Sequence, residues 1–121
     1  MRRLVLCLAT IAAVPMCIAA PATGHYQATL CVATPASAPP SCGPAELEIQ
    51  SASRAEVRVS DVVYRLHLRP RQVDVSTRQG RMEIDEFSAE YAWKGDVLSF
   101  FDADKKARYE VKARARIRSP R

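Results

Sequence analysis

The stretch "KARYEVKARARI" at residues 106–117 decides the expected fold, because its apolar and charged residues alternate strictly. One parity carries only Ala, Tyr, Val and Ile, whereas the other carries only Lys, Arg and Glu. A period of two is typical of a strand with one face buried and the other in water, and helical spacing does not fit the same set. We therefore expect a half-buried strand here, with all six apolar residues on its inner face.

The same period recurs upstream, in "RAEVRVS" (54–60) and "VYRLHLR" (63–69). The parity changes at Ser60–Asp61, which indicates a turn or a bulge between the two stretches. Further strands are expected at residues 25–33, 45–51, 72–77, 81–93 and 97–102.

The longest of these runs, residues 81–93, changes parity after Ile84, so we expect a bulge near Asp85–Glu86. About eight short strands joined by tight turns, with no convincing helix, predict an all-β fold. Its expected form is a small antiparallel barrel or sandwich. A barrel of eight strands is just wide enough for its own side chains to fill.

The N-terminus has the layout of a secretory signal peptide. Arg2 and Arg3 precede an apolar segment, Pro15 ends it, and small residues follow. Cleavage after Ala22 or after Ala19 fits the small residues there. We expect residues 1–22 to be the signal, residues 23–121 to form a single β domain, and no transmembrane span to remain after cleavage. The expected location is periplasmic or secreted.

The cysteine count depends on that cleavage, because Cys7 and Cys17 leave with the signal and only Cys31 and Cys42 remain. Two cysteines in a small exported chain most simply pair with each other. A zinc site needs two more ligands, and His25 and His67 have no ligand spacing. We expect a disulfide that closes residues 31–42, a Pro/Ala/Ser-rich stretch, into a surface loop.

Charge is distributed in blocks along the chain. Residues 54–81 carry a net +4, residues 82–104 a net −6, and residues 105–121 a net +7. Such blocks are typical of solvated faces or of complementary neighbouring strands. The basic C-terminal end also offers contacts to an anionic surface, with Lys112, Arg114, Arg116 and Arg118 expected on one face. Our first interpretation is that this row protects a strand edge from pairing with a second copy, and binding to an anionic surface is secondary to it.

No catalytic or cofactor signature is recognisable. The "DADKK" stretch at 102–106 begins like a calcium loop but has Ala107 at the obligatory glycine position, so we expect a hairpin turn. His67 has no evident acid or nucleophile partner. We expect no metal, no cofactor, no catalytic residue and no nucleic-acid partner.

Aromatic residues concentrate near the C-terminal half. Six of the eight lie between positions 87 and 109, which predicts a shared aromatic core at one end of the barrel. Phe100 and Phe101 are adjacent, so one of them is expected to face away from that core. An exposed aromatic is a candidate anchor for a partner.

The stretch "SAEYAWKGDVLSF" at 88–100 resembles the late hairpin of the small periplasmic C-type lysozyme inhibitors. Those are exported bacterial β-barrels with a Ser-Gly-x-x-Tyr motif followed by an aromatic residue and a Lys-Gly-Asp-like turn. Here Ala89 replaces the glycine, and the interval from Ser88 to Tyr91 is one residue shorter. The resemblance implies Ser88, Tyr91 and Lys94 as candidate partner contacts. Phe101 is a fourth candidate, because one of the two adjacent phenylalanines is expected to be exposed.

These observations predict a non-catalytic binding protein, such as an inhibitor or a partner of an envelope protein or of an anionic envelope component. The alternative is a carrier of a small apolar ligand, of lipocalin-like type. A cavity of about 300 Å³ or more would favour that carrier over a barrel filled by its own side chains. An enzyme of unrecognised type ranks third and would need His67 and a carboxylate to converge in a cleft.

Overall fold

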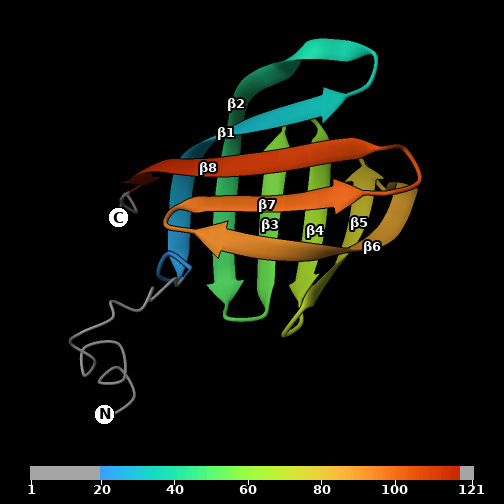
Figure 1. Ribbon diagram of the computed structural model, residues 1–121. Coiled ribbons are helices and arrows are strands. Elements are labelled where there is room, and N and C mark those ends of the chain that lie inside the picture. Colours follow the sequence, from blue (N-terminus) through green and yellow to red (C-terminus); the bar gives the residue numbers. More distant parts are fainter. Residues whose placement is uncertain (1–19, 118–121) are drawn as a thin grey trace, which may run out of the picture.

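The computed structural model describes residues 20–117, which form one antiparallel sheet of eight strands closed into a barrel (Figure 1). Each strand pairs with its neighbours in chain order, and the last strand pairs with the first. The expected all-β class is confirmed, and of the two expected forms the barrel is the one present. The strands are β1 (Gly24–Thr34), β2 (Ser37–Ser51), β3 (Arg54–Val59), β4 (Val62–Leu68), β5 (Gln72–Gln79), β6 (Met82–Lys94), β7 (Val97–Asp102) and β8 (Ala107–Ile117).

Tight turns join the strands where the sequence changes parity or carries glycine. Ser60 adopts a positive φ of 57° in the β3–β4 turn, so the parity change there is a turn and not a bulge. Gly80 and Gly95 supply the positive φ needed in the β5–β6 and β6–β7 turns. The expected hairpin at 102–106 is the β7–β8 turn.

Inward side chains fill the barrel, as its size requires. Phe100 and Tyr109 stack with ring centroids 5.1 Å apart, and Phe87 stacks on Tyr109 at 5.8 Å. Tyr64 meets Tyr109 edge-on, so the expected aromatic core is present. The buried apolar residues are Tyr26, Ala28, Leu30, Leu47, Ile49, Ala55, Val57, Leu66, Leu68, Val73, Val75, Ala89, Trp93, Leu98, Phe100, Ala107, Tyr109, Val111 and Ala113.

A bulge in β6 produces the change of parity that its sequence predicts. Thr77 pairs with Asp85 and Arg78 pairs with Glu83, so Ile84 is the extra residue. The bulge therefore lies one residue before the expected Asp85–Glu86. Its effect is the one predicted, since Phe87, Ala89 and Trp93 face the core beyond it.

A second bulge, in β8, was not predicted. Gln27 pairs with Ala115 while Ala28 pairs with Ala113, which leaves Arg114 as the extra residue. Beyond it the two faces exchange, so Ala115 is exposed and Arg116 lies opposite the inward Tyr26. The expectation of one continuous inner face through Ala115 is therefore wrong.

The stretch expected as a disulfide-closed loop is instead a pair of strands. Cys31 and Cys42 are joined and lie directly opposite each other in the β1–β2 register, with their Cα atoms 4.0 Å apart. Only Pro35 and Ala36 form the turn. We call residues 29–45 the disulfide ribbon. Its turn end stands above the rest of the barrel in Figure 1.

No helix long and apolar enough to cross a membrane occurs in residues 20–117. The expected signal sequence and Arg118 lie outside the described residues, apart from Ala20–Ala22. Those three residues precede β1. The hydroxyl of Tyr26 donates to the carbonyl of Ala22 at 2.6 Å.

Candidate functional site

The outer surface beside the disulfide ribbon carries an exposed aromatic residue. Phe100 and Phe101 follow each other on β7, and because strand residues alternate, Phe100 is buried while Phe101 is 43% exposed. The Arg108 guanidinium lies 5.9 Å from the centre of the Phe101 ring. The prediction that one of this pair faces outward is confirmed, and the outward residue is Phe101.

Phe101 and Arg108 stand between two hollows of the outer surface. One, of about 260 Å³, lies over β6 and β7, and Arg108 and Phe101 form part of its lining. The other, of about 170 Å³, is walled by the disulfide, Ala33 and Pro40, and it shares Arg108. We call this combined surface the ribbon groove.

The groove continues along β8 as a row of charged side chains. A third hollow, of about 490 Å³, shares Cys31 and Glu110 with the second and adds Lys112 and Arg114. Within residues 20–117, Glu110, Lys112 and Arg114 have no ion-pair partner. A wall of small apolar groups thus meets charges that remain available to another molecule.

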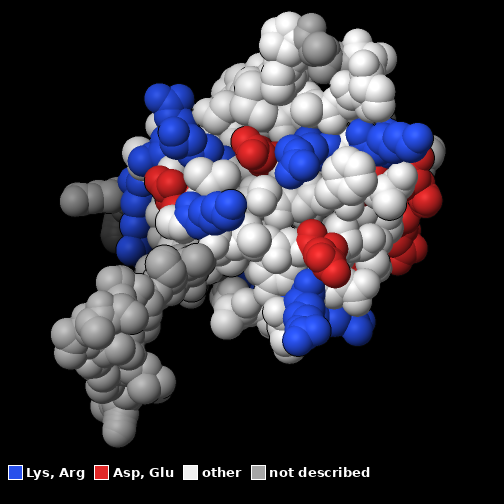
Figure 2. Space-filling view, viewed as in Figure 1, with Lys and Arg blue, Asp and Glu red and all other residues white. Residues whose placement is uncertain are grey.

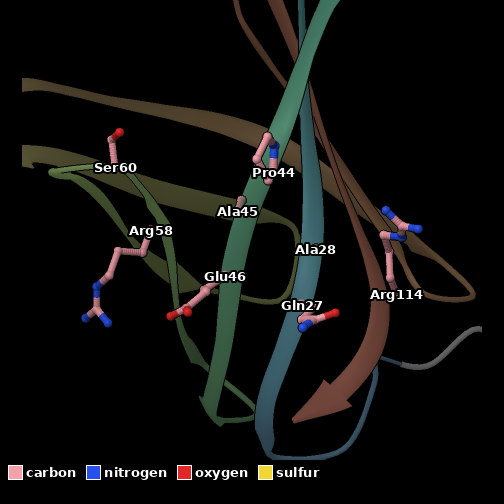
Figure 3. A pocket seen from close by; sticks show the side chains of 8 residues that line it. All are labelled: Gln27, Ala28, Pro44, Ala45, Glu46, Arg58, Ser60 and Arg114. Carbon is pink, nitrogen blue, oxygen red and sulfur yellow. The ribbon is translucent and has the colours of Figure 1, made fainter.

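The fourth hollow, of about 470 Å³, lies on the neighbouring outer surface of β1 and β2 (Figure 3). Arg58 and Arg114 line it from opposite sides of this strand pair, with Gln27 and Glu46 between them. Arg58 already bonds Glu56 at 3.1 Å. Its two cations do not converge, so we assign no anion site to it.

The four expected partner contacts do not form one surface. Ser88 lies on the outer side of β6, where its hydroxyl donates to Asp74 at 2.7 Å, and Lys94 is exposed at the β6–β7 turn. Tyr91 lies on the core side and donates to the carbonyl of Arg69 at 2.6 Å. Of the four, Phe101 and Tyr91 line the ribbon groove, and Phe101 is the one whose side chain points outward there.

The expected basic row is likewise divided. Lys112 and Arg114 are exposed on the outer face, but the β8 bulge turns Arg116 to the opposite face. There its guanidinium donates to the carbonyl of Thr23 at 2.7 Å and lies 5.9 Å from the Tyr26 ring centre. The expectation of a single row is therefore wrong at Arg116.

The edge-protection interpretation of this row does not apply to Lys112, which lies on a paired stretch of β8, and it stays a prediction at Arg114 and Arg116, where β8 pairs with β1 alone. Because the barrel is closed, β8 pairs with β1 on one side and, over Ala107–Lys112, with β7 on the other. Charges at Arg108, Glu110 and Lys112 therefore guard no edge. They are free for another role.

An ionic cluster caps the end of the barrel, where the sequence indicated only a turn. Asp102 is 1% exposed, and its carboxylate accepts the backbone N–H of Asp104 at 3.0 Å. The Lys105 ammonium contacts Asp85 and lies 3.0 Å from Asp102. It also lies 5.4 Å from the centre of the Phe87 ring, over the aromatic core.

The pKa values in this cluster favour a structural role. The hydrogen bond from Lys105 lowers the pKa of Asp85, and the bond to Asp85 raises the pKa of Lys105. Burial raises the pKa values of Tyr64 and Tyr109. A permanently protonated lysine is a poor base and a poor nucleophile, so the cluster seals the barrel and offers no acid–base pair.

His67 does not form the hydrogen bond with a carboxylate that the enzyme hypothesis requires. Its Nδ1 lies 3.9 Å from the Asp74 carboxylate, beyond hydrogen-bond distance, and both side chains lie on the open outer surface. The hydrogen bond from Ser88 and the nearby Arg69 lower the pKa of Asp74. Within residues 20–117, no three His, Cys, Asp or Glu side chains gather as a metal site would require.

Two residues of the ribbon groove, Arg108 and Glu110, were missed as site residues. Their alternation with Lys112 placed them on the same outer face, but nothing in the sequence indicated that the disulfide lies beside them. Comparisons of this chain with protein-family models, curated proteins and solved structures find no match.

Proposed function

We propose that this is an exported, non-catalytic binding protein of the periplasm or the secreted fraction. Its partner is a protein or an anionic component of the cell envelope. The observation that carries the proposal is the ribbon groove, in which Arg108 lies between the exposed Phe101 and a wall formed by the disulfide. Charges without an ion-pair partner in residues 20–117 continue it along β8. An exposed aromatic residue beside a rigid apolar wall is typical of the anchor of an interface. A disulfide is consistent with an oxidising compartment.

Rigidity makes the groove suited to binding. The disulfide holds β1 and β2 together at Cys31 and Cys42, and β8 flanks β1 along the groove. A preformed surface loses little conformational entropy when a partner binds. Inhibition of a lysozyme, which the resemblance of residues 88–100 implies, is one form that such binding would take.

The test compares two exposed apolar residues. The exported chain, immobilised, is used to capture proteins from envelope extract, alongside Phe101→Ser and Ile84→Ser variants. We expect a specific partner to be lost with Phe101→Ser and retained with Ile84→Ser, which lies outside the groove. Equal capture by all three chains would contradict the assignment of the groove. Addition of the chain to a lysozyme assay tests the inhibitor form directly.

The anionic alternative has its own readout. Vesicles containing phosphatidylglycerol are sedimented with the wild type and with a Lys112→Gln, Arg114→Gln double variant. Binding that is lost in the variant and at high salt identifies an anionic partner, because screening weakens exposed charges. Absence of vesicle binding leaves the protein partner as the proposal.

A second candidate function, the apolar-ligand carrier, has one observation in its favour. Aromatic packing fills the barrel around Tyr109, but a hollow of about 320 Å³ lies at its end. The hollow reaches the ligand-pocket scale of about 300 Å³, and no charged residue lines it. Three of its nine lining residues, Ala20–Ala22, belong to the expected signal, so the hollow has this full lining only while that segment is attached. Its lining is Ala20, Pro21, Ala22, Thr23, Ile49, Ser51, Ala52, Leu68 and Trp93.

The single tryptophan, Trp93, reports on that hollow. Energy transfer from Trp93 to the neutral dye N-phenyl-1-naphthylamine would detect a ligand bound there. Ala52→Leu fills the hollow, and Ala33→Leu makes the same change in the ribbon groove as a control. Transfer that survives Ala52→Leu would exclude this site.

A further inference from the structure

The first half of β6 has a neighbour on only one side. Within the described residues, Met82–Ser88 pairs with β5 alone, because the register of β6 with β7 covers only Tyr91–Lys94. A strand with one unpaired side offers backbone N–H and C=O groups to a further strand. On the inner side of this gap, Lys105 reaches across to Asp85 and covers the aromatic core. Among the described residues, no ion pair reaches the outer carboxylates of this stretch, Glu83 and Glu86.

Large apolar side chains lie exposed at the same place. Met82 is 66% exposed and Ile84 is 48% exposed, and Ile84 is the bulged residue. Burial of such side chains is favourable, so soluble chains seldom place two together in water without a partner. The unpaired side of β6 is thus both open and apolar at its start.

Charge determines which strand can pair there. Glu83, Glu86 and Glu90 are exposed on this half of β6 and have no ion-pair partner in residues 20–117. Two copies of this acidic edge would repel each other, which disfavours a symmetric β6–β6 pair. A basic strand would be attracted to it.

The same chain carries a basic strand end of that kind. Arg114–Ile117 pairs with β1 alone, since β7 reaches only to Lys112. Lys112 and Arg114 are exposed and unpaired, and apolar residues alternate with basic ones here. Figure 2 shows Lys and Arg gathered at the left, where Figure 1 places the end of β8. Asp and Glu gather at the right rim.

We propose that the open edge of β6 (Met82–Ser88) binds the open basic end of β8 (Arg114–Ile117), with Lys112 beside it, of a second copy of this chain. The two surfaces differ, so in such a pair one copy keeps a free β6 edge and the other keeps a free β8 end. Association of this head-to-tail type adds further copies as concentration rises. The β8 surface overlaps the charged end of the ribbon groove, since Lys112 and Arg114 line both, whereas the β6 edge lies outside the groove. The Glu83→Lys, Glu86→Lys variant described below therefore tests association without altering the groove.

The first experiment is sedimentation velocity of the exported chain over a range of concentrations. We expect the sedimentation coefficient to rise with concentration at low salt, where the screening length is about 30 Å, and to fall when added salt reduces it to about 8 Å. A wild type that stays monomeric at every concentration and at low salt would overturn the proposal.

Charge reversal then assigns the two surfaces. One variant carries Glu83→Lys with Glu86→Lys, and the other carries Lys112→Glu with Arg114→Glu. Each variant alone should associate at least about tenfold more weakly than the wild type, since like charges then face each other. The first variant has a basic β6 edge and the second has an acidic β8 end, so these two altered edges attract each other. The native β8 end of the first and the native β6 edge of the second also remain complementary. Mixed together, they should recover association that contains both chains.

Controls separate this pairing from a change of net charge or of folding. Arg54→Glu with Arg71→Glu changes the net charge as much as the β8 variant does, but lies away from both edges. It should associate like the wild type. Thermal unfolding of each variant shows that the barrel is intact. Self-association that persists in both charge-reversed variants, or that fails to return in their mixture, would also overturn the proposal.

Discussion

Within residues 20–117, β2, β6 and β8 each extend beyond the partner on one side, and the open edges of β2 and β6 differ in composition. The β2 half at Ser37–Ala45 pairs with β1 alone, and so does the β6 half at Met82–Ser88 with β5. The first carries Pro39, Pro40 and Pro44 and no charged residue, and a disulfide holds it. The second has no proline or disulfide, but has carboxylates and exposed apolar side chains.

This difference shows two ways to control an open strand edge. One prevents any further strand from pairing, and the other admits only strands of complementary charge. Proline has no N–H to offer, so it blocks pairing whatever the sequence of the incoming strand. Acidic side chains reject some strands and attract others. We therefore interpret β2 as a protected edge and β6 as a selective one.

The largest expected effect concerns the covalent support of β2. Cys31→Ser with Cys42→Ser should lower the free energy of unfolding by about 2–5 kcal/mol, as loss of a disulfide does in small secreted domains. Urea unfolding of variant and wild type measures the difference. Reduction of the wild type is the control and should reproduce the loss. If the variant unfolds at the same midpoint, the ribbon does not depend on its disulfide.

A smaller loss of stability is expected at Met82–Ser88 of β6, where the contact of Lys105 with Asp85 stands in place of backbone pairing with β7. Lys105→Met removes the ammonium from Asp85 and from the buried Asp102, leaving that carboxylate without its cation. Loss of a partner by a buried polar group costs about 1–3 kcal/mol. Lys106→Met is the matched control, because no ion pair or hydrogen bond of Lys106 is present in residues 20–117. Equal unfolding midpoints for both variants would contradict the sealing role of Lys105.

The acid dependence of stability should arise from the β6 region and not from Ser37–Ala45 of β2, which contains no charged residue. The pKa of Asp85 is lowered in the folded state by Lys105, so its contribution is present above the ordinary aspartate pKa of about 3.9. That contribution is lost as the pH falls through the lowered value. Asp85→Asn should therefore flatten the acid limb of a plot of unfolding midpoint against pH. An unchanged acid limb would assign the acid sensitivity to other carboxylates, such as Asp74.

The smallest effect on stability is expected from the prolines of β2. Pro40→Ala and Pro44→Ala should each change the free energy of unfolding by less than about 1 kcal/mol. Their measurable consequence is association, since an alanine restores an N–H on the β2 half that has no second strand. Light scattering after prolonged incubation should show more aggregate for the double variant than for the wild type. Identical scattering would show that the prolines do not protect this edge.

Much of the fold could be predicted from the sequence, because a period of two directly reports which residues face the core. The strand at 106–117, the parity change after Ile84 and the outward position of Phe101 were all predictable in this way. The β8 bulge was not, since Ala113 and Ala115 are both small enough for either face. A bulge changes register without changing composition, so alternation alone cannot place it.

The candidate site was less predictable than the fold. Phe101 could be anticipated because two adjacent aromatic residues cannot share one face of a strand. The ribbon was expected as a loop because Pro, Ala and Ser favour turns, and the pairing of Cys31 with Cys42 outweighed that preference. The burial of Asp102 depends on Lys105 and the aromatic core together, which the sequence brings near only through the β7–β8 turn.

The pairing of β1 with β8 has a consequence for the order in which this chain can fold. Every other pair of strands is a hairpin between neighbours, and such local contacts form early. The last pair joins residues near both ends, so it carries the largest loop-closure entropy and must wait for the whole chain. During synthesis the domain therefore remains an open series of hairpins until Ile117 has emerged. Closure of the barrel therefore follows the synthesis of β8, however early the individual hairpins form.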